Sequence, residues 1–107
     1  MASIYLDKLS SDFIKPVVDK NYHDVYHIFN VRHEKRDELK DYLLQNNIKT
    51  EIHYPVSPSH QKALQGKLKE YIYPISEEIH QTTLSLPISF CHSEEEVHRV
   101  VEVMNKF

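Results

Sequence analysis

The side chains best able to do chemistry in this chain lie in one short stretch, NNIKTEIHYPVSPSH, which covers residues 46–60. His53 and Tyr54 end a segment that is predicted to be a strand, and His60 follows after a proline-containing turn. Pro55 favours an extended conformation at Tyr54, so the two neighbouring side chains are predicted to leave the strand end in opposite directions. Because loops that follow strands in α/β proteins often bind ligands, His53 and Tyr54 are candidate binding residues. The alternative is an edge-strand histidine that binds nothing.

Eight histidines raise the question of a metal site. His23 and His27 are four positions apart, but they flank the start of a predicted strand, where such positions lie roughly 13 Å apart. No cysteine and histidine spacing resembles a closed zinc site. We therefore predict no metal ligand. His27 is expected in the core, and four other histidines are expected to be solvated or capping residues: His33, His80, His92 and His98.

No catalytic residue is predicted in this chain. Cys91 lies beside His92, but sequence neighbours do not make a catalytic dyad, and no third group is evident that would orient the histidine. The run Glu94–Glu96 indicates a helix start rather than a carboxylate pair for acid and base catalysis. Gly66 is the only glycine, so a glycine-rich phosphate cradle cannot be built here, and no cofactor-binding residue is predicted.

Composition limits the functional classes. The 107 residues suggest one domain, 1–107, and 40% hydrophobic with 27% charged residues is typical of a globular fold. A net charge of -3 argues against a general nucleic-acid-binding protein. No segment is long and apolar enough to predict a membrane span, and the N-terminus does not resemble a signal peptide. The single cysteine excludes an internal disulfide, and a reducing, cytoplasmic location is the simplest prediction.

Three segments are predicted to be strands. Residues 25–32 and 48–54 alternate in polarity, and residues 84–88 form an apolar run that ends near Pro87. The inward face of the first strand is predicted to carry Val25, His27, Phe29 and Val31. The inward face of the second is predicted to carry Ile48, Thr50, Ile52 and Tyr54, which leaves His53 on the solvent side.

Helices are predicted between and around these strands. A clear helical pattern covers residues 34–47. Residues 3–10 have a weaker one, and residues 59–70 have the weakest. Asn47 is predicted to end the second helix in a left-handed conformation, where asparagine is second only to glycine. Two further helices are predicted to start at Ser76 and Ser93, and the latter forms a capping box with Glu96.

The order of elements predicts an α/β (α+β) fold, a two-layer sandwich in which a small three-stranded sheet carries helices mainly on one face. The other face of such a sheet would lack a cover, as would the first helix. Exposed apolar surface of this kind tends to be covered. We therefore expect self-association through the sheet surface and through Ile4, Leu6 and Leu9.

Three pieces of the sequence together resemble the C-terminal domain of the DegT/StrS family. They are VYHIFNVR, the run RDELKDYLLQNNIKTEIHYPVSPSHQKAL, and LSLPISFCHSEEEVHRVVEVM. The characteristic piece is a strand ending in His-Tyr-Pro with a second histidine soon after, matched by His53, Tyr54, Pro55 and His60. The chain departs from the family pattern at Asn47, where glycine is usual, and in the run VSPSH, which replaces a more apolar one.

The resemblance implies a small domain like that of fold-type I aminotransferases, which use pyridoxal phosphate. Family members act on nucleotide-linked keto-sugars in amino-sugar and polysaccharide biosynthesis. It implies that His53, Tyr54 and His60 contact the substrate, that a large N-terminal domain holds the cofactor, and that the enzyme is a homodimer. The large domain is not in this sequence, so the chain alone is expected to be inactive.

Two functional classes stay open at this point. The chain is either the part of an aminotransferase that helps close the substrate pocket, or a non-enzymatic interaction module that kept the fold without the chemistry. In either case it is expected to be a piece of a longer protein, one half of a split protein or a degenerate gene product.

Overall fold

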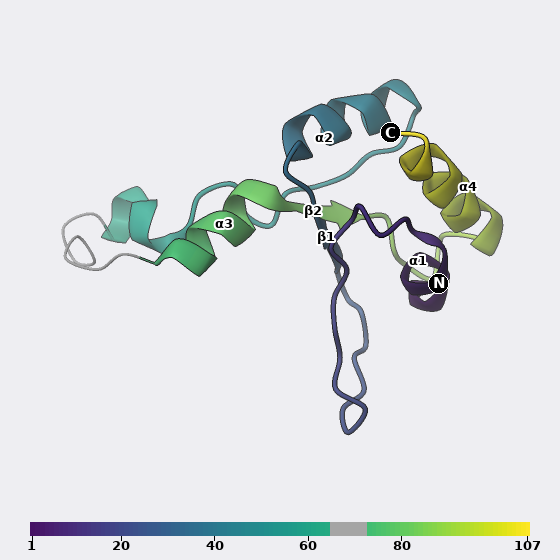
Figure 1. The fold of residues 1–107 in the computed structure, drawn as a ribbon, viewed down its shortest axis with the longest axis horizontal. Coiled ribbons are helices and arrows are strands. Elements are labelled where there is room, and N and C mark those ends of the chain that lie inside the picture. The colour runs from purple at the N-terminus through teal and green to yellow at the C-terminus, as the bar shows by residue number, and fades with distance from the viewer. Residues whose placement is uncertain (65–72) are drawn as a thin grey trace.

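The computed structural model describes residues 1–64 and 73–107, which form α-helices, two strands and two short 3-10 helices (Figure 1). The elements are α1 (Ala2–Lys8), β1 (Phe29–Arg32), α2 (Arg36–Gln45), η1 (Pro58–His60), η2 (Lys62–Leu64), α3 (Pro74–Thr82), β2 (Thr83–Leu86) and α4 (Glu94–Asn105). No helix among these residues is long and apolar enough to cross a membrane.

The sheet in the described part of the chain has two strands, not the predicted three. β1 and β2 pair antiparallel, with Phe29 opposite Leu86. The predicted strand 48–54 touches the sheet only at Glu51, which exchanges backbone hydrogen bonds of 2.7 and 3.2 Å with Ser85. Pro55 directly follows this segment and has no N–H to donate, which disfavours a longer ladder here.

The first strand is also shorter than predicted, since it begins at Phe29 rather than at residue 25. The register of the two strands explains the late start of β1. Phe29 pairs with Leu86, the last residue of β2, and the residue that follows Leu86 is Pro87, which has no N–H to donate to a ladder. The stretch before β1 therefore has no partner strand. Val25 is 83% exposed and His27 is also exposed, so the prediction that both lie in the core is wrong.

Helices α1, α2 and α4 contribute to one hydrophobic core with the sheet. The inward residues of β1 and β2 pack there, including Phe29, Leu84 and Leu86, each at most 4% exposed. The helices add a larger set of buried residues: Tyr5, Leu39, Leu43, Val97, Val100, Val101 and Met104. α3 contributes no buried residue, so the core is built by three helices and two strands.

Local signals in the sequence placed two helix ends correctly. Ser93 caps α4 with the predicted capping box: its Oγ accepts from the Glu96 N–H at 3.2 Å, and the Glu96 carboxylate accepts from the Ser93 N–H at 2.7 Å. Asn47 follows α2 with a φ of 62°, the left-handed conformation predicted for it. Both motifs satisfy backbone groups that a helix end leaves unpaired.

One other helix prediction was wrong, and a second is tested only in part. α3 starts at Pro74 with Tyr73 as its N-cap, so Ser76 lies inside the helix instead of before it. Proline at the first helical position has the right φ and lacks an N–H that would be unpaired there, which explains the earlier start. Of the predicted helix 59–70, the structure describes only the two 3-10 turns η1 and η2, and Gly66 lies outside the described residues.

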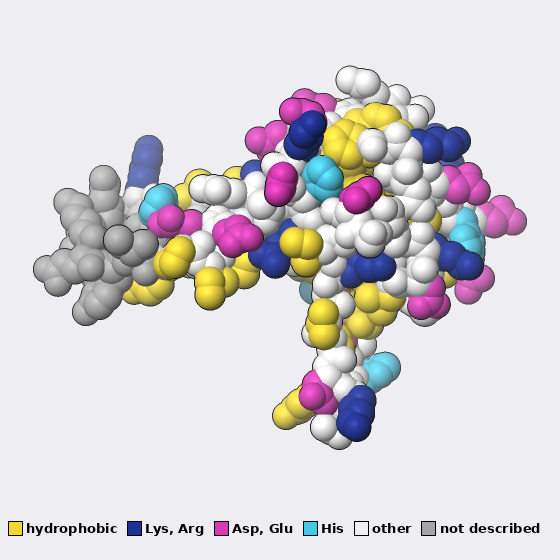
Figure 2. All heavy atoms as spheres, in the orientation of Figure 1, with side chains coloured by type: hydrophobic (Ala, Val, Ile, Leu, Met, Phe, Trp, Pro, Cys, Tyr) yellow, Lys and Arg dark blue, Asp and Glu magenta, His cyan; other side chains and the backbone are white. Residues whose placement is uncertain are grey.

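The molecule has two extensions beyond its core (Figure 1). Its radius of gyration is 15.3 Å, whereas a compact chain of this length is expected near ~13 Å. One extension contains α3 and the 3-10 helices. The other is residues 15–28, here called the arm, which carries apolar side chains on its surface (Figure 2), and Val17, Tyr22 and Val25 are at least 75% exposed.

The first helix is covered rather than bare. Leu9 is 4% exposed and belongs to the core, while Ile4 and Leu6 are half-buried against it. The expectation that these three residues form an open association surface is therefore wrong, because α1 packs on α4. Exposed apolar groups lie instead on the arm, on α3, where Ile75 is 72% exposed, and in the loop after β2, where Phe90 is 97% exposed.

Candidate functional site

His53 and Tyr54 lie side by side where the chain leaves its bridge to β2. Their rings are 5.2 Å apart between centroids and meet at 85°, an edge-to-face contact. The prediction that they point in opposite directions is therefore wrong. His53 is half-buried, whereas Tyr54 is 61% exposed, so the pair presents an imidazole and a phenol together at one place on the surface.

The ring of His53 is held by a chain of two hydrogen bonds across the sheet. Its Nδ1 lies 2.7 Å from the Oγ of Ser85, and that hydroxyl donates to Oδ1 of Asn30 at 2.6 Å. Asn30 and Ser85 are direct partners in the β1–β2 register, and Ser85 is 6% exposed. His53 is therefore positioned by residues from both strands.

The neighbouring α3 is joined to the same segment through the backbone. Nδ1 of His80 donates to the carbonyl oxygen of Tyr54 at 2.5 Å, which requires a proton on that nitrogen. His80 was expected to be solvated or capping, and the structure instead gives it a bond that fixes the main chain after His53. His53, Tyr54 and His80 are thus connected, through the ring contact of His53 with Tyr54 and the hydrogen bond from His80 to the Tyr54 backbone.

Arg36 fastens the end of α3 to α2. Its guanidinium donates to the carbonyl oxygens of His80 at 3.1 Å and Thr83 at 3.0 Å, and to the carboxylate of Asp37 at 2.6 Å. Arg36 is 8% exposed, and a buried guanidinium needs such partners because an unpaired charge is costly to bury. This contact sets where α3, and with it His80, leaves the core.

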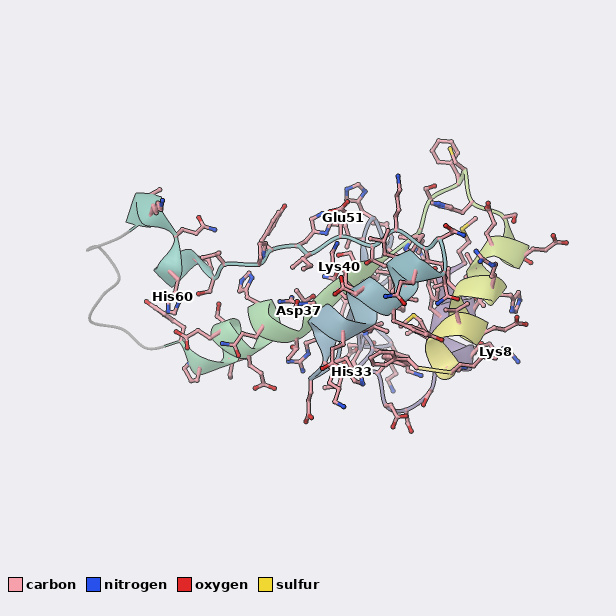
Figure 3. All side chains as sticks on the ribbon, turned by 90° about the horizontal axis from the view of Figure 1, so that it is seen from above. Lys8, His33, Asp37, Lys40, Glu51 and His60 are labelled. Atoms are coloured by element: carbon pink, nitrogen blue, oxygen red, sulfur yellow. The ribbon has the colours of Figure 1, made fainter. Side chains whose placement is uncertain are left out.

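His60 lies apart from this group. It ends η1, and its Nε2 is 2.9 Å from Oε1 of Glu77 in the first half of α3. Figure 3 shows His60 toward the outer end of α3, away from Glu51, which lies two residues before His53. The structure therefore brings His53 and Tyr54 together but places the third candidate, His60, in η1, where it contacts the first half of α3.

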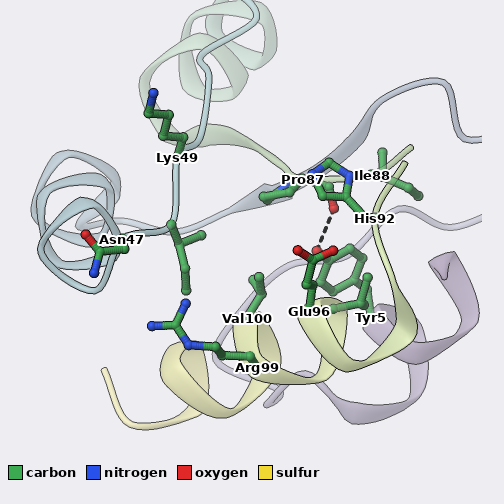
Figure 4. A pocket seen from close by; sticks show the side chains of 11 residues that line it. Tyr5, Asn47, Lys49, Pro87, Ile88, His92, Glu96, Arg99 and Val100 are labelled. Atoms are coloured by element: carbon green, nitrogen blue, oxygen red, sulfur yellow. Dashed lines mark hydrogen bonds between the residues drawn. The ribbon is translucent and has the colours of Figure 1, made fainter. Parts of the chain in front are cut away.

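The described residues also contain a cleft of about 570 Å³, shown in Figure 4. Its apolar wall comes from α1, α4 and the chain after β2, and its polar rim includes Lys49, His92, Glu96 and Arg99. Neither His53 nor Tyr54 nor His60 lines it. Glu96 is occupied with the α4 capping box, and Arg99 donates to the carbonyl oxygen of Asn46 at 2.8 Å. Two of the charged rim residues, Glu96 and Arg99, are thus engaged in holding the fold.

Pyridoxal phosphate does not fit the residues that the structure describes. Such a site needs a lysine held at the cofactor and a cradle for its phosphate. Every lysine among the described residues is exposed or half-buried, and Lys15, one of the half-buried ones, donates to the carbonyl oxygens of Leu6 and Leu9. The only glycine, Gly66, lies outside the described residues.

Other chemical candidates are equally accounted for. Within residues 1–64 and 73–107, no three histidine, cysteine or acidic side chains gather in a way that could hold a metal ion. Cys91 is exposed, and the ring of its neighbour His92 bonds to the hydroxyl of Ser89 at 2.9 Å. His92 is therefore engaged with a serine and not with the thiol.

Sequence reasoning missed Asn30 and Ser85. Each is a polar residue that alternates with buried apolar ones, in FNVR and in TLSL, so both were treated as ordinary strand positions. The signal that could have found them is the pairing itself. Once the strands are placed in register, the two side chains must lie on the same face, opposite the core.

Comparisons with known proteins agree on one family. The sequence pattern of the DegT/DnrJ/EryC1/StrS aminotransferase family matches residues 2–105. The chain is 43% identical, over its whole length, to a dTDP-3-amino-3,6-dideoxy-alpha-D-galactopyranose transaminase from Aneurinibacillus thermoaerophilus. It is also 37% identical, over 84% of its length, to a pleiotropic regulatory protein from Geobacillus stearothermophilus.

Solved structures show the same fold. The crystal structure of Streptomyces venezuelae DesV, in complex with a ketimine intermediate, superposes with a TM-score of 0.87 over 98% of this chain at 31% identity. In every case the match is to part of a longer protein. The chain covers 30% of the Aneurinibacillus relative, 24% of the Geobacillus relative and 29% of DesV.

Proposed function

The chain belongs to the DegT/DnrJ/EryC1/StrS aminotransferase family, and from that premise we propose that it is the C-terminal small domain of a nucleotide-sugar aminotransferase. The Aneurinibacillus relative, which aligns with all of this chain, is named as a transaminase of a dTDP-linked amino sugar. The proposed substrate is accordingly a nucleotide-linked keto-sugar, and the proposed cofactor of the whole enzyme is pyridoxal phosphate.

The single observation that carries this proposal is the geometry of His53 and Tyr54. Nδ1 of His53 is engaged with Ser85, and Nε2 has no partner among the described residues. The phenol of Tyr54 stands beside it, 61% exposed. A positioned imidazole nitrogen and a phenol can each exchange hydrogen bonds with sugar hydroxyls. We propose that these two groups contact the sugar or its nucleotide.

Substrate binding and cofactor chemistry are proposed to lie in different parts of the whole protein. We propose that the chemistry of amino transfer belongs to a separate cofactor-binding domain, and the lack of a fitting lysine and cradle among the described residues supports this. The proposed role of this chain is to bind and orient the substrate and to help close the pocket over it. Its proposed partners are the large cofactor-binding domain and a second copy in a homodimer. His60, held by Glu77, would contact a more distant part of the substrate.

A chimera tests the proposal. The segment of the Aneurinibacillus transaminase that aligns with this chain is replaced by residues 1–107, and transamination of its dTDP-sugar is assayed. A transaminase lacking that segment is the control. The proposal predicts that the chimera is active and the truncated protein is not. A chimera that carries the cofactor with its normal absorbance but does not bind the sugar would overturn it.

A second candidate function is an interaction module. The Geobacillus relative is named a regulatory protein, and the arm exposes Val17, Tyr22 and Val25 as an interacting surface would. This candidate predicts that the chimera is inactive, while the 107-residue chain binds a partner through the arm. Replacing the three arm residues with serine would abolish that binding and leave the melting temperature unchanged, since none of them is buried.

A further inference from the structure

We infer that Asn30 and Ser85 are positioning residues that fix the tautomer of His53, placing its proton on Nδ1 and leaving Nε2 as a hydrogen-bond acceptor. The consequence of this inference rests on the proposed function: Nε2 of His53 accepts a hydrogen bond from a hydroxyl group of the sugar. It concerns two residues that the sequence did not single out and that do not themselves face the proposed substrate.

The tautomer follows from counting protons along the two hydrogen bonds. A serine hydroxyl has one proton to donate and lone pairs to accept with. Ser85 donates that proton to Oδ1 of Asn30 at 2.6 Å. It can therefore only accept from His53 at 2.7 Å, so the hydrogen must sit on Nδ1. A neutral imidazole carries one N–H, which leaves Nε2 with its lone pair.

The backbone holds these three side chains in line. Ser85 is paired through its main chain with Glu51 on one side and faces Asn30 across the β1–β2 ladder on the other. His53 is two residues after Glu51, and its Nδ1 reaches the hydroxyl of Ser85. Ser85 is 6% exposed, which limits the access of water that could otherwise replace either bond. The order of donors and acceptors is thus set by the fold.

The tautomer decides what kind of group His53 can recognise. With the proton on Nδ1, the outward Nε2 accepts from a donor, such as a sugar hydroxyl. With the opposite tautomer, Nε2 would donate and would favour a keto oxygen or a phosphate oxygen. The edge-to-face contact with Tyr54 at 5.2 Å restricts rotation of the ring, which helps keep Nε2 directed outward. Asn30 and Ser85 therefore determine specificity through His53.

Nuclear magnetic resonance of the 107-residue chain tests the inference without any substrate. Long-range correlations between ring protons and ¹⁵N nuclei distinguish a protonated from an unprotonated ring nitrogen. His53 is assigned with His53→Gln, and spectra are recorded at alkaline pH, where an imidazole is neutral. The expected spectrum shows a protonated Nδ1 and an unprotonated Nε2. A wild-type spectrum with the proton mainly on Nε2 would overturn the inference by itself.

Variants show which residue sets the tautomer. Asn30→Val removes the acceptor, so Ser85 is free to donate to Nδ1 and the ring should change to the Nε2–H form. Asn30→Asp keeps an acceptor and should keep the wild-type tautomer. Asn30 is exposed in β1, where valine and aspartate can both be accommodated, and amide spectra confirm that each variant is folded. An Asn30→Val spectrum that is folded and unchanged would contradict the role of Asn30.

Kinetics in the chimera separate this inference from the proposed function. Asn30→Val should raise KM for the dTDP-sugar by about fivefold, the size expected from losing one hydrogen bond, and Asn30→Asp should restore it. If His53→Ala raises KM but the wild-type tautomer is Nε2–H, only the present inference fails. If the tautomer is as expected but His53→Ala leaves KM unchanged, the proposed function fails.

Discussion

Tyr5 in α1 donates a hydrogen bond of 2.6 Å to the carbonyl oxygen of Pro87, 82 positions later in the chain. The tyrosine is fully buried, and its ring lies 5.0 Å from that of Phe29 in β1. The contact joins the N-terminal helix to the exit of β2. It thus fixes the strand that carries Ser85 against the first helix of the core.

Removing this hydroxyl should destabilise the fold. Tyr5→Phe keeps the ring but leaves the Pro87 carbonyl without its donor, which is expected to lower the free energy of unfolding by about 1–2 kcal/mol. Urea denaturation followed by circular dichroism measures the change. Tyr22→Phe is the matched control, because Tyr22 is 75% exposed, and it should alter stability by less than about 0.5 kcal/mol. Equal effects of the two substitutions would contradict the assigned bond.

Alkaline pH should act through the same residue. Burial raises the pKa of the Tyr5 phenol well above its usual value, so the folded protein keeps this proton where the unfolded chain releases it. Stability from this group is therefore present below the unfolded pKa of ~10 and falls as pH rises above it. In urea titrations between neutral and strongly alkaline pH, Tyr5→Phe should lose less stability than wild type. A Tyr5→Phe protein as alkali-sensitive as wild type would be inconsistent with this.

The α4 cap offers a second stability test. Ser93→Ala removes the acceptor for the Glu96 N–H and should lower the free energy of unfolding by about 1 kcal/mol. Ser11→Ala, at an exposed position outside the helices, provides the comparison. Thermal denaturation measures both. The prediction is wrong if the two alanine variants melt at the same temperature.

Arg36 should be sensitive to a change that keeps its charge. Arg36→Lys cannot reach the two carbonyl oxygens and Asp37 together, so it should cost about 2 kcal/mol and speed amide exchange in residues 80–83. Arg99→Lys is the control, because Arg99 is exposed and makes one backbone contact. Hydrogen-exchange mass spectrometry measures the local effect. Unchanged exchange at the end of α3 would show that Arg36 does not hold that helix.

Much of the fold was predictable because its signals are local. The capping box at Ser93, the left-handed Asn47 and the end of β2 at Pro87 each depend on a few neighbouring residues. The helix-covered face of the sheet followed from alternating apolar positions, such as Phe29 and Val31, which are both fully buried.

The sheet could not be predicted in the same way, because strand length depends on a partner. Residues 25–28 have the alternation of a strand but no edge to pair with, since Pro87 ends the ladder opposite them. Residues 48–54 have it as well, and only Glu51 reaches β2. Whether an alternating segment pairs is decided by long-range contacts that no local pattern contains.

For the same reason, only some residues of the candidate site could be predicted from the sequence. His53 and Tyr54 stood out by residue type and by their place before Pro55. Asn30, Ser85 and His80 did not, because their importance arises from the distances that tertiary structure creates.

His53 is the residue on which the proposed contact with the sugar nucleotide depends most directly. In the chimera with the Aneurinibacillus transaminase, steady-state kinetics of His53→Ala should show a KM for the dTDP-sugar raised by about tenfold, the loss expected for a well-formed hydrogen bond. The absorbance of the bound cofactor should be unchanged, and His98→Ala, at an exposed position on α4, should behave as the parent chimera. A KM for His53→Ala equal to that of the parent chimera, with cofactor absorbance intact, would contradict the account.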